Sequence, residues 1–217
     1  MPLVHTIRDT EMSLGLWEIT EDSSFFEQAM SYRSVASNPG QQLQQLASRM
    51  VLKAMQPSFP FDQIQLNPAG KPSLSDGQQF SISHTRGFAA GIISSDAPVG
   101  IDIEFISPRV LKIEKKFLNA HEYALLAPLS EQDRVVYASL FWSIKETVYK
   151  CWGNGGVDFS EQIRIRSFAL KGQGTADVEF GHDTAVHSVH YHREGDLWLT
   201  YMKALLHKKA PLQGQGS

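Results

Sequence analysis

The stretch that decides the fold is VGIDIEF, residues 99–105. Its apolar residues alternate with Gly100, Asp102 and Glu104, which predicts a β-strand with one apolar face. The two carboxylates then lie on the same face, with their Cα atoms roughly 6.6–7 Å apart, and Gly100 leaves room for something to approach the backbone. Neighbouring carboxylates repel each other unless a cation lies between them, and hard oxygen ligands suit Mg²⁺. The pattern therefore predicts either half of a magnesium site or an amphipathic strand with a solvated acidic face.

A second stretch, FWSIKETVYK (residues 141–150), reads as a helix with two distinct stripes. Trp142, Glu146 and Lys150 follow one another four residues apart and therefore share a face. The other stripe is apolar and is predicted to pack in the core: Phe141, Ile144, Val148 and Trp152. Glu146 and Lys150 form either an ordinary surface pair or a third carboxylate and a cation for the site on the strand.

Two short segments offer groups that bind phosphate. Lys71 lies in a loop between Pro68 and Pro72, and FSISHT (residues 80–85) ends a strand with Ser83 and His84. An ammonium group, a hydroxyl and an imidazole can all donate hydrogen bonds to phosphate oxygens. The alternative is an ordinary exposed lysine and ordinary turn chemistry.

The rest of the chain indicates an α+β fold made of two halves. In the first half, residues 14–19, 79–83 and 88–94 read as strands, and residues 22–32 and 41–55 read as helices. In the second half, Asn119 and Glu122 predict a capping box at the start of a helix, and Ser130 is predicted to open another helix that ends near Trp152. Three further segments read as strands: residues 163–170, 185–192 and 197–205. We predict an N-terminal half over residues 1–97, a C-terminal half over residues 98–210 and a mobile tail over residues 211–217.

The composition of the chain argues against several classes of function and of site. The chain of 217 residues has a net charge of −3, which argues against a general binder of nucleic acid or of anionic membranes. Cys151 is the single cysteine, so neither an internal disulfide nor a CxxC metal site can form. We see no signal peptide and no apolar run of about 20 residues, and expect a cytoplasmic protein. His190 and His192 share a strand face, which fits a solvated strand better than a metal site.

Taken together, GKP, FSISHT, VGIDIE and FWSIKETVYK resemble the surfactin-synthetase-activating type of 4′-phosphopantetheinyl transferase. That family shows a (V/I)G(I/V)D-x-E strand, followed about forty residues later by (F/W)S-x-KE-x-x-x-K. Asp102 and Trp142 are 40 positions apart here. The resemblance spans roughly residues 14–205, and it implies a pseudo-dimer of two similar α+β halves, each a small antiparallel sheet with packed helices.

The resemblance also implies roles for individual residues. The metal ligands would be Asp102, Glu104 and Glu146. The catalytic residues would be Glu146, Lys150 and Asp102. Lys71, Ser83 and His84 would hold the phosphates of coenzyme A, with Gly70 and Pro72 beside the adenine. The cation for the 3′-phosphate is left open among Arg49, Arg33 and Arg86.

The function implied is transfer of the phosphopantetheine arm of coenzyme A to a serine of an apo acyl or peptidyl carrier protein, with release of 3′,5′-ADP. Mg²⁺, or Mn²⁺ in its place, would neutralise the pyrophosphate, and Glu146 would accept the serine proton directly or through water. We expect a monomer, and no residue pattern separates the fatty acid, polyketide and non-ribosomal peptide pathways. The alternatives are a non-catalytic module that binds coenzyme A or a carrier, and a protein whose motifs coincide by chance.

We predict that the carrier docks on the surface formed by residues 107–126. It carries basic residues that would steer an acidic partner: Arg109, Lys112, Lys115 and Lys116. Interleaved apolar residues would anchor it: Val110, Leu111, Phe117 and Leu118. The alternative is an ordinary helix with a solvated basic face.

Overall fold

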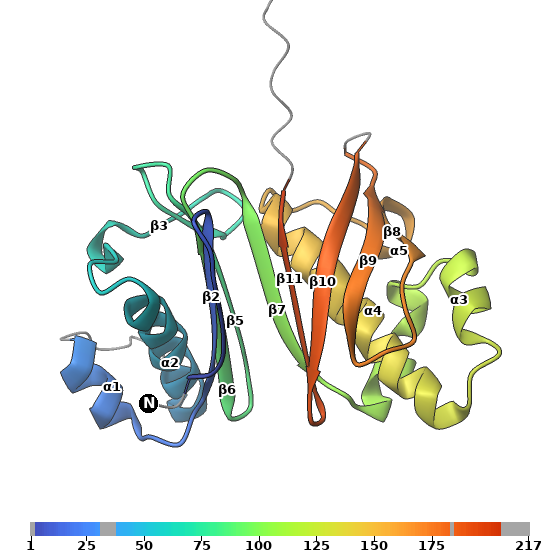
Figure 1. Ribbon diagram of the computed structural model, residues 1–217, viewed down its shortest axis with the longest axis horizontal. Coiled ribbons are helices and arrows are strands. Elements are labelled where there is room, and N and C mark those ends of the chain that lie inside the picture. The colour runs from blue at the N-terminus through green and yellow to red at the C-terminus, as the bar shows by residue number, and fades with distance from the viewer. Residues whose placement is uncertain (1–2, 31–37, 183–184, 205–217) are drawn as a thin grey trace, which may run out of the picture.

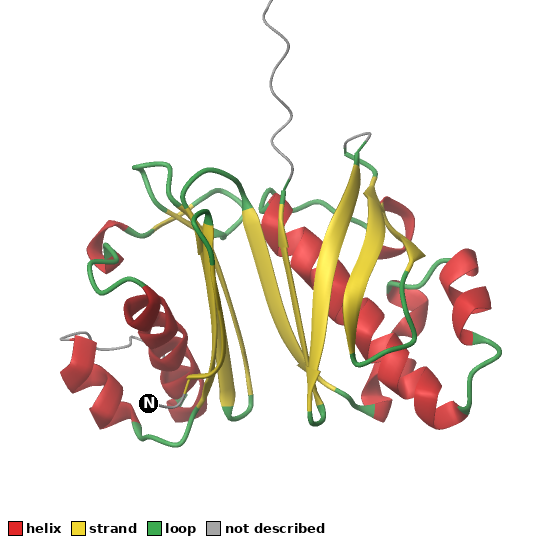
Figure 2. Cartoon of the chain, viewed as in Figure 1, coloured by secondary structure: helices red, strands yellow, loops and turns green. Residues whose placement is uncertain are grey.

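The fold consists of two antiparallel sheets, each covered by helices on its outer face (Figures 1 and 2). The computed structural model describes residues 3–30, 38–182 and 185–204. The first sheet has the order β1-β2-β6-β5, with β1 at Leu3–Arg8, β2 at Met12–Glu18, β6 at Phe88–Ser94 and β5 at Gln79–Thr85. The second has the order β7-β11-β10-β9-β8, with β7 at Val99–Phe105, β11 at Leu197–Lys203, β10 at Val186–Glu194, β9 at Gln173–Phe180 and β8 at Ile163–Ser167. This architecture confirms the predicted α+β class and is consistent with two similar halves.

Helices close the outer face of each sheet. α1 (Ser23–Met30) and α2 (Pro39–Met55) pack on the first sheet, while α3 (Ala120–Leu126), α4 (Glu131–Trp152) and α5 (Phe159–Gln162) pack beside the second. A short hairpin, β3 (Gln65–Leu66) and β4 (Pro72–Ser73), connects α2 to β5. The predicted helix starts are confirmed, because Asn119 and Glu122 form a capping box and the Ser130 side chain caps α4.

The inner faces of the two sheets pack against each other through a shared apolar layer. This layer contains buried side chains from both halves, among them Leu14, Ile92, Ile101 and Leu199. Along one side of the layer β5 lies next to β7, but the two strands do not share a backbone ladder. Instead, the side-chain hydroxyls of Ser81 and Ser83 accept hydrogen bonds from the backbone N–H groups of Ile101 and Ile103, each at 3.3 Å. We call this junction the serine seam.

Gly100 explains how α4 comes to lie directly on β7. A Cβ atom at this position would be 2.1 Å from the backbone oxygen of Thr147 and 2.9 Å from the backbone nitrogen of Cys151. Any side chain larger than hydrogen would therefore push the helix away from the strand. The room predicted beside Gly100 is taken up by the backbone of α4, and this contact sets the height of Glu146 and Lys150 above the strand.

Some sequence-based expectations were wrong or fall outside the described residues. β1 and β9 were not predicted as strands. Trp152 was assigned to the core stripe of α4, but it is 36% exposed because it follows the last buried turn and stacks on His182.

Residues 31–32, 205 and 211–217 lie outside the described part of the chain, and the boundary at residues 97/98 stays a prediction. Within the described ranges, no helix is both long and apolar enough to cross a membrane.

Candidate functional site

Asp102 is the point at which three elements of the site meet. It lies on β7 with only 5% of its surface exposed. Its Oδ1 accepts hydrogen bonds from Ser83 Oγ on β5 at 2.9 Å and from Lys150 Nζ on α4 at 2.7 Å. Lys150 Nζ also donates to Ser83 Oγ at 2.9 Å. The structure therefore brings together three residues that the sequence placed in one site, one of them from the N-terminal half.

The second oxygen of Asp102 is held by hydroxyl groups that sequence reasoning missed. Ser143 Oγ donates to Asp102 Oδ2 at 2.8 Å and lies 2.8 Å from Thr200 Oγ1. Thr147 Oγ1 lies 2.6 Å from the same Thr200 hydroxyl. The available signal was weak: Ser143 and Thr147 lie four residues apart on one face of α4, and Thr200 pairs with Asp102 across the sheet. This network fixes the Asp102 carboxylate without neutralising its charge.

The other two carboxylates are held close to Asp102 at an electrostatic cost. Burial, and then the negative charges of Asp102 and Glu146, raise the pKa of Glu104 to about 7. Burial, and then the charge of Asp102, raise the pKa of Glu146, and Lys150 opposes this shift. A site in which carboxylates raise each other's pKa values has excess negative charge, which a divalent cation would offset.

The three carboxylates suit a metal ion by their chemistry. Three carboxylates that repel one another are the hard oxygen ligands that Mg²⁺ takes. In the described residues, however, no group of three or more His, Cys, Asp or Glu side chains is arranged so that it could hold a metal ion. The ammonium of Lys150 lies on Asp102 Oδ1 instead. The carboxylates therefore fit a cation in ligand chemistry and in charge, while the Lys150 ammonium pairs with one of them. The rings of His190 and His192 stack on those of Tyr201 and His5, respectively.

A cavity of about 210 Å³ lies beside Lys150, between the two halves. It is lined by the loop of residues 67–72, here called the GKP loop, by β5 and by the end of α4: Ala69, Gly70, Lys71, Pro72, Phe80, Ser81, Ile82, Tyr149, Lys150, Gly153 and Gly155. Lys71 Nζ donates to the backbone oxygen of Cys151, at the C-terminal end of α4, at 3.1 Å. Burial lowers the pKa of Lys71. Lysines from both halves therefore flank one cavity.

The other described candidates for phosphate binding are not among the residues that line this cavity. His84 follows Ser83 on β5, and although much of its side chain is exposed, partial burial lowers its pKa and the nearby charge of Lys150 acts in the same direction. Arg49 lies on α2, which covers the opposite face of the first sheet, and is not among the residues lining the cavity. Arg86 is exposed in the β5–β6 turn, and Arg33 lies outside the described residues. The cation for the 3′-phosphate stays unassigned.

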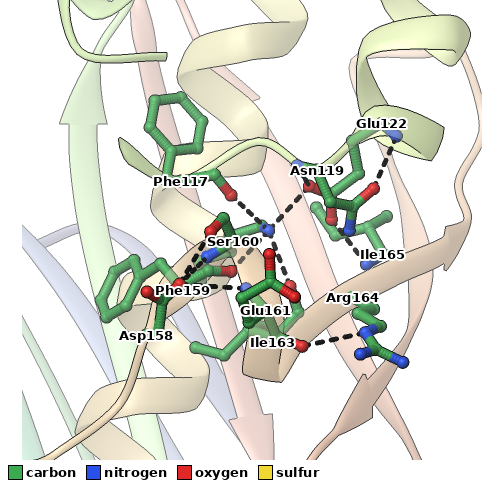
Figure 3. Close-up of polar contacts among 11 residues, drawn as sticks. Phe117, Asn119, Glu122, Asp158, Phe159, Ser160, Glu161, Ile163, Arg164 and Ile165 are labelled. Atoms are coloured by element: carbon green, nitrogen blue, oxygen red, sulfur yellow. Dashed lines mark hydrogen bonds and ion pairs between the residues drawn. The ribbon is translucent and has the colours of Figure 1, made fainter. Parts of the chain in front are cut away.

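Lys145, directly before Glu146, is completely buried. Its ammonium pairs with Glu122 Oε2 at 2.7 Å and also donates to three backbone oxygens: Phe117 at 2.6 Å, Ile163 at 2.6 Å and Phe159 at 2.9 Å. Figure 3 shows these acceptors converging from the segments before α3 and around α5. Glu122 also accepts from the backbone N–H groups of Asn119 and Ile165. Sequence reasoning missed this buried pair, which fastens both segments to α4 beside the site.

The surface predicted for the carrier is only partly as expected. Its four basic residues are exposed: Arg109, Lys112, Lys115 and Lys116. The apolar anchors were wrong, because Val110, Phe117 and Leu118 are buried in the core of the C-terminal half. A hollow of about 410 Å³ lies next to Lys116 instead, lined also by Ile113, Trp142, Val157, Asp158 and Phe159.

Known proteins of one superfamily are similar to this chain in sequence. Residues 98–202 match the model of the 4′-phosphopantetheinyl transferase superfamily. The chain is 34% identical to the 4′-phosphopantetheinyl transferase ffp of Bacillus subtilis over 129 residues, which are 54% of this chain and 56% of the relative. It is 37% identical to the 4′-phosphopantetheinyl transferase gsp of Aneurinibacillus migulanus over 112 residues, 52% of this chain and 45% of the relative. The matches thus span about half the length of the curated relatives.

Proposed function

Residues 98–202 place this chain in the 4′-phosphopantetheinyl transferase superfamily, and on that basis we propose that it transfers 4′-phosphopantetheine from coenzyme A to a serine of an apo carrier protein. One observation carries the proposal: Lys150 and Asp102 meet Ser83 where the two halves join, beside a cavity lined by Lys71. The serine oxygen would form a bond to the phosphorus that carries the pantetheine arm. The bond from this phosphorus to 3′,5′-ADP would break.

Two lysines would hold the pyrophosphate of coenzyme A from opposite sides. Lys71 approaches from the loop of the N-terminal half and Lys150 from α4, and both line the cavity. Phosphoryl transfer depends mainly on in-line positioning and on neutralising charge, which such a pair supplies. Lys150 would leave Asp102 Oδ1 and turn to the phosphate oxygens, where negative charge develops as the bond breaks.

Glu146 is the proposed general base. Its raised pKa brings the carboxylate closer to the range in which proton transfer at neutral pH is efficient. Its place on α4, one turn before Lys150, would set it beside the phosphorus held by that lysine.

The residues that would hold Mg²⁺ are Asp102, Glu104 and Glu146. Bound there, the ion would supply Lewis-acid stabilisation of the pyrophosphate charge. Release of Asp102 Oδ1 by Lys150 would open the position that the ammonium now covers. The excess negative charge of the three carboxylates supports this assignment.

The acidic carrier would dock on the exposed basic residues of the 107–126 surface, with the hollow at Trp142 and Phe159 as its apolar anchor. Charge steers such encounters and changes their rate more than their contact energy. We expect the K112E/K115E/K116E variant to raise the KM for the carrier and to leave the Kd for coenzyme A unchanged. An unchanged KM for the carrier would contradict the surface, and K171E, a reversal at an exposed lysine outside it, is the control.

The experiment that tests the function is mass spectrometry of a panel of apo carrier proteins incubated with the protein, coenzyme A and Mg²⁺. We expect the mass of one phosphopantetheine on a carrier serine and stoichiometric 3′,5′-ADP. EDTA should abolish the product, and added Mg²⁺ should restore it. Binding of coenzyme A without transfer to any carrier would favour a non-catalytic module instead, and transfer at full rate in EDTA would contradict the metal assignment.

A further inference from the structure

Asn67 is the most heavily hydrogen-bonded residue of the GKP loop. Its side-chain Oδ1 accepts from the backbone N–H groups of Ala69 at 3.0 Å and Lys71 at 2.8 Å. Its backbone N–H donates to the Lys71 oxygen, and its backbone oxygen accepts from Gly70. Through these bonds Asn67 closes the loop that carries Lys71.

The remaining group of Asn67 reaches across to the other half of the molecule. Its Nδ2 donates to the backbone oxygen of Gly153 at 2.7 Å. Gly153 ends α4 with a φ of +70°, and a Cβ atom there would be 2.2 Å from Lys71 Cδ. The last carbonyls of a helix lack partners within it, so an amide donor at this point satisfies one of them. The Asn67 amide and the Lys71 ammonium thus connect the loop to the C-terminal end of α4, at the backbone oxygens of Gly153 and Cys151.

These two hydrogen bonds to the end of α4 differ in whether they can persist when a ligand binds. Lys71 holds Cys151 with the ammonium group that would bind a phosphate. Asn67 uses an amide that is not needed for the ligand, so its bond to Gly153 persists when Lys71 turns away. Lys150 lies on the same helix, one turn before Gly153, and lines the same cavity.

We propose that Asn67 is a positioning residue that sets the loop bearing Lys71 at a fixed distance from the helix bearing Lys150. The two ammonium groups then fit a single pyrophosphate without rearrangement of the halves. This inference rests on the proposed binding of coenzyme A. It assigns Asn67 no contact with the reacting atoms.

Three variants separate the tie from the local turn. Asn67→Asp keeps the Oδ1 acceptor for Ala69 and Lys71 but sets a carboxylate oxygen against the Gly153 oxygen. Asn67→Ser keeps a hydroxyl acceptor for the turn and cannot reach Gly153. Asp76→Ala is the matched control, because the Asp76 side chain accepts from the backbone N–H of Gln78 within the same half.

The readout is the Kd for coenzyme A, measured by titration calorimetry, with the midpoint of thermal unfolding as a check on folding. We expect N67D to raise the Kd roughly tenfold, the effect of one lost half-buried hydrogen bond, and N67S to follow it. D76A should change the Kd by less than about twofold. In the background of Lys71→Ala, N67D should add little, because the lysine that it positions is already gone.

Two results would overturn the proposal. One is an N67D variant that binds coenzyme A like the unmodified protein. The other is an N67D effect of the same size with and without Lys71, which would show that Asn67 acts on stability alone. Failure of the unmodified protein to bind coenzyme A would be a different outcome, because it would remove the proposed function together with this role of Asn67.

Discussion

Replacing Lys145 by methionine should destabilise the protein strongly, although the two side chains have similar length. The substitution leaves the Glu122 carboxylate buried without its cation and three backbone oxygens without their donor. Breaking a buried ion pair on one side costs about 3–5 kcal/mol, a large share of the roughly 5–15 kcal/mol that holds a typical domain folded. The backbone N–H groups of Asn119 and Ile165 still bond to Glu122, which places the expectation at the lower end of that range.

The assay is urea unfolding, monitored by tryptophan fluorescence. The urea concentration at the midpoint of unfolding is compared between variants, and it reports a change in stability if the slope of the free energy of unfolding against urea is unchanged. Lys171→Met, at an exposed lysine, should stay within about 0.5 kcal/mol of the unmodified protein. In the K145M/E122Q double variant the buried charge is gone, so the loss should be clearly smaller than the sum of the single losses. A K145M loss below about 1 kcal/mol, or full additivity in the double variant, would refute the account of a buried pair that fastens these segments.

Three further outcomes are expected. Gly100→Ala should cost about 1–3 kcal/mol and weaken coenzyme A binding, because its Cβ would be 2.1 Å from the Thr147 oxygen; unchanged urea unfolding would contradict this. Lys71→Ala should raise the KM for coenzyme A at nearly constant kcat, whereas Lys150→Ala should lower kcat by about 10²-fold; a Lys150 effect on KM alone would remove its assigned role. Because the pKa of Glu104 is raised to about 7, its carboxyl group must lose a proton before Mg²⁺ binds, so the affinity for Mg²⁺ measured by calorimetry should fall as the pH drops below about 7. Equal affinities at about pH 6 and pH 8 would argue against Glu104 as a ligand.

The parts of the fold that could be predicted are those with a local cause. β7 has a clear alternation of apolar and polar residues, and the capping box at Asn119 depends on residues three positions apart. β9 was missed because it begins with polar residues and only its second half alternates, with Ala176, Val178 and Phe180 buried. Its signal is too short to stand out before the neighbouring strands are in place.

The site shows the same division. The grouping of Asp102 and Lys150 followed from the resemblance of their two motifs to one family. The burial of Lys145 could not be predicted, because its partners come from Glu122 and from backbone oxygens that carry no sequence signature. Phe117 was misjudged for a related reason: it follows three lysines within a few residues, and only the packing against Trp142 shows that it points inward.

The serine seam has a consequence for the order in which the chain is made. Domains synthesised on the ribosome fold from the N-terminus, so the first sheet can form while β7 is still being translated. During that interval the outer edge of β5 offers unpaired backbone groups, which in many proteins recruit a strand from another molecule. The arriving β7 donates its backbone N–H groups at Ile101 and Ile103 to the hydroxyls of Ser81 and Ser83 on this edge. A foreign strand can offer backbone N–H groups to the same hydroxyls, but it lacks the Asp102 carboxylate that accepts from Ser83 Oγ, and the nascent chain is thereby guided toward its own second half.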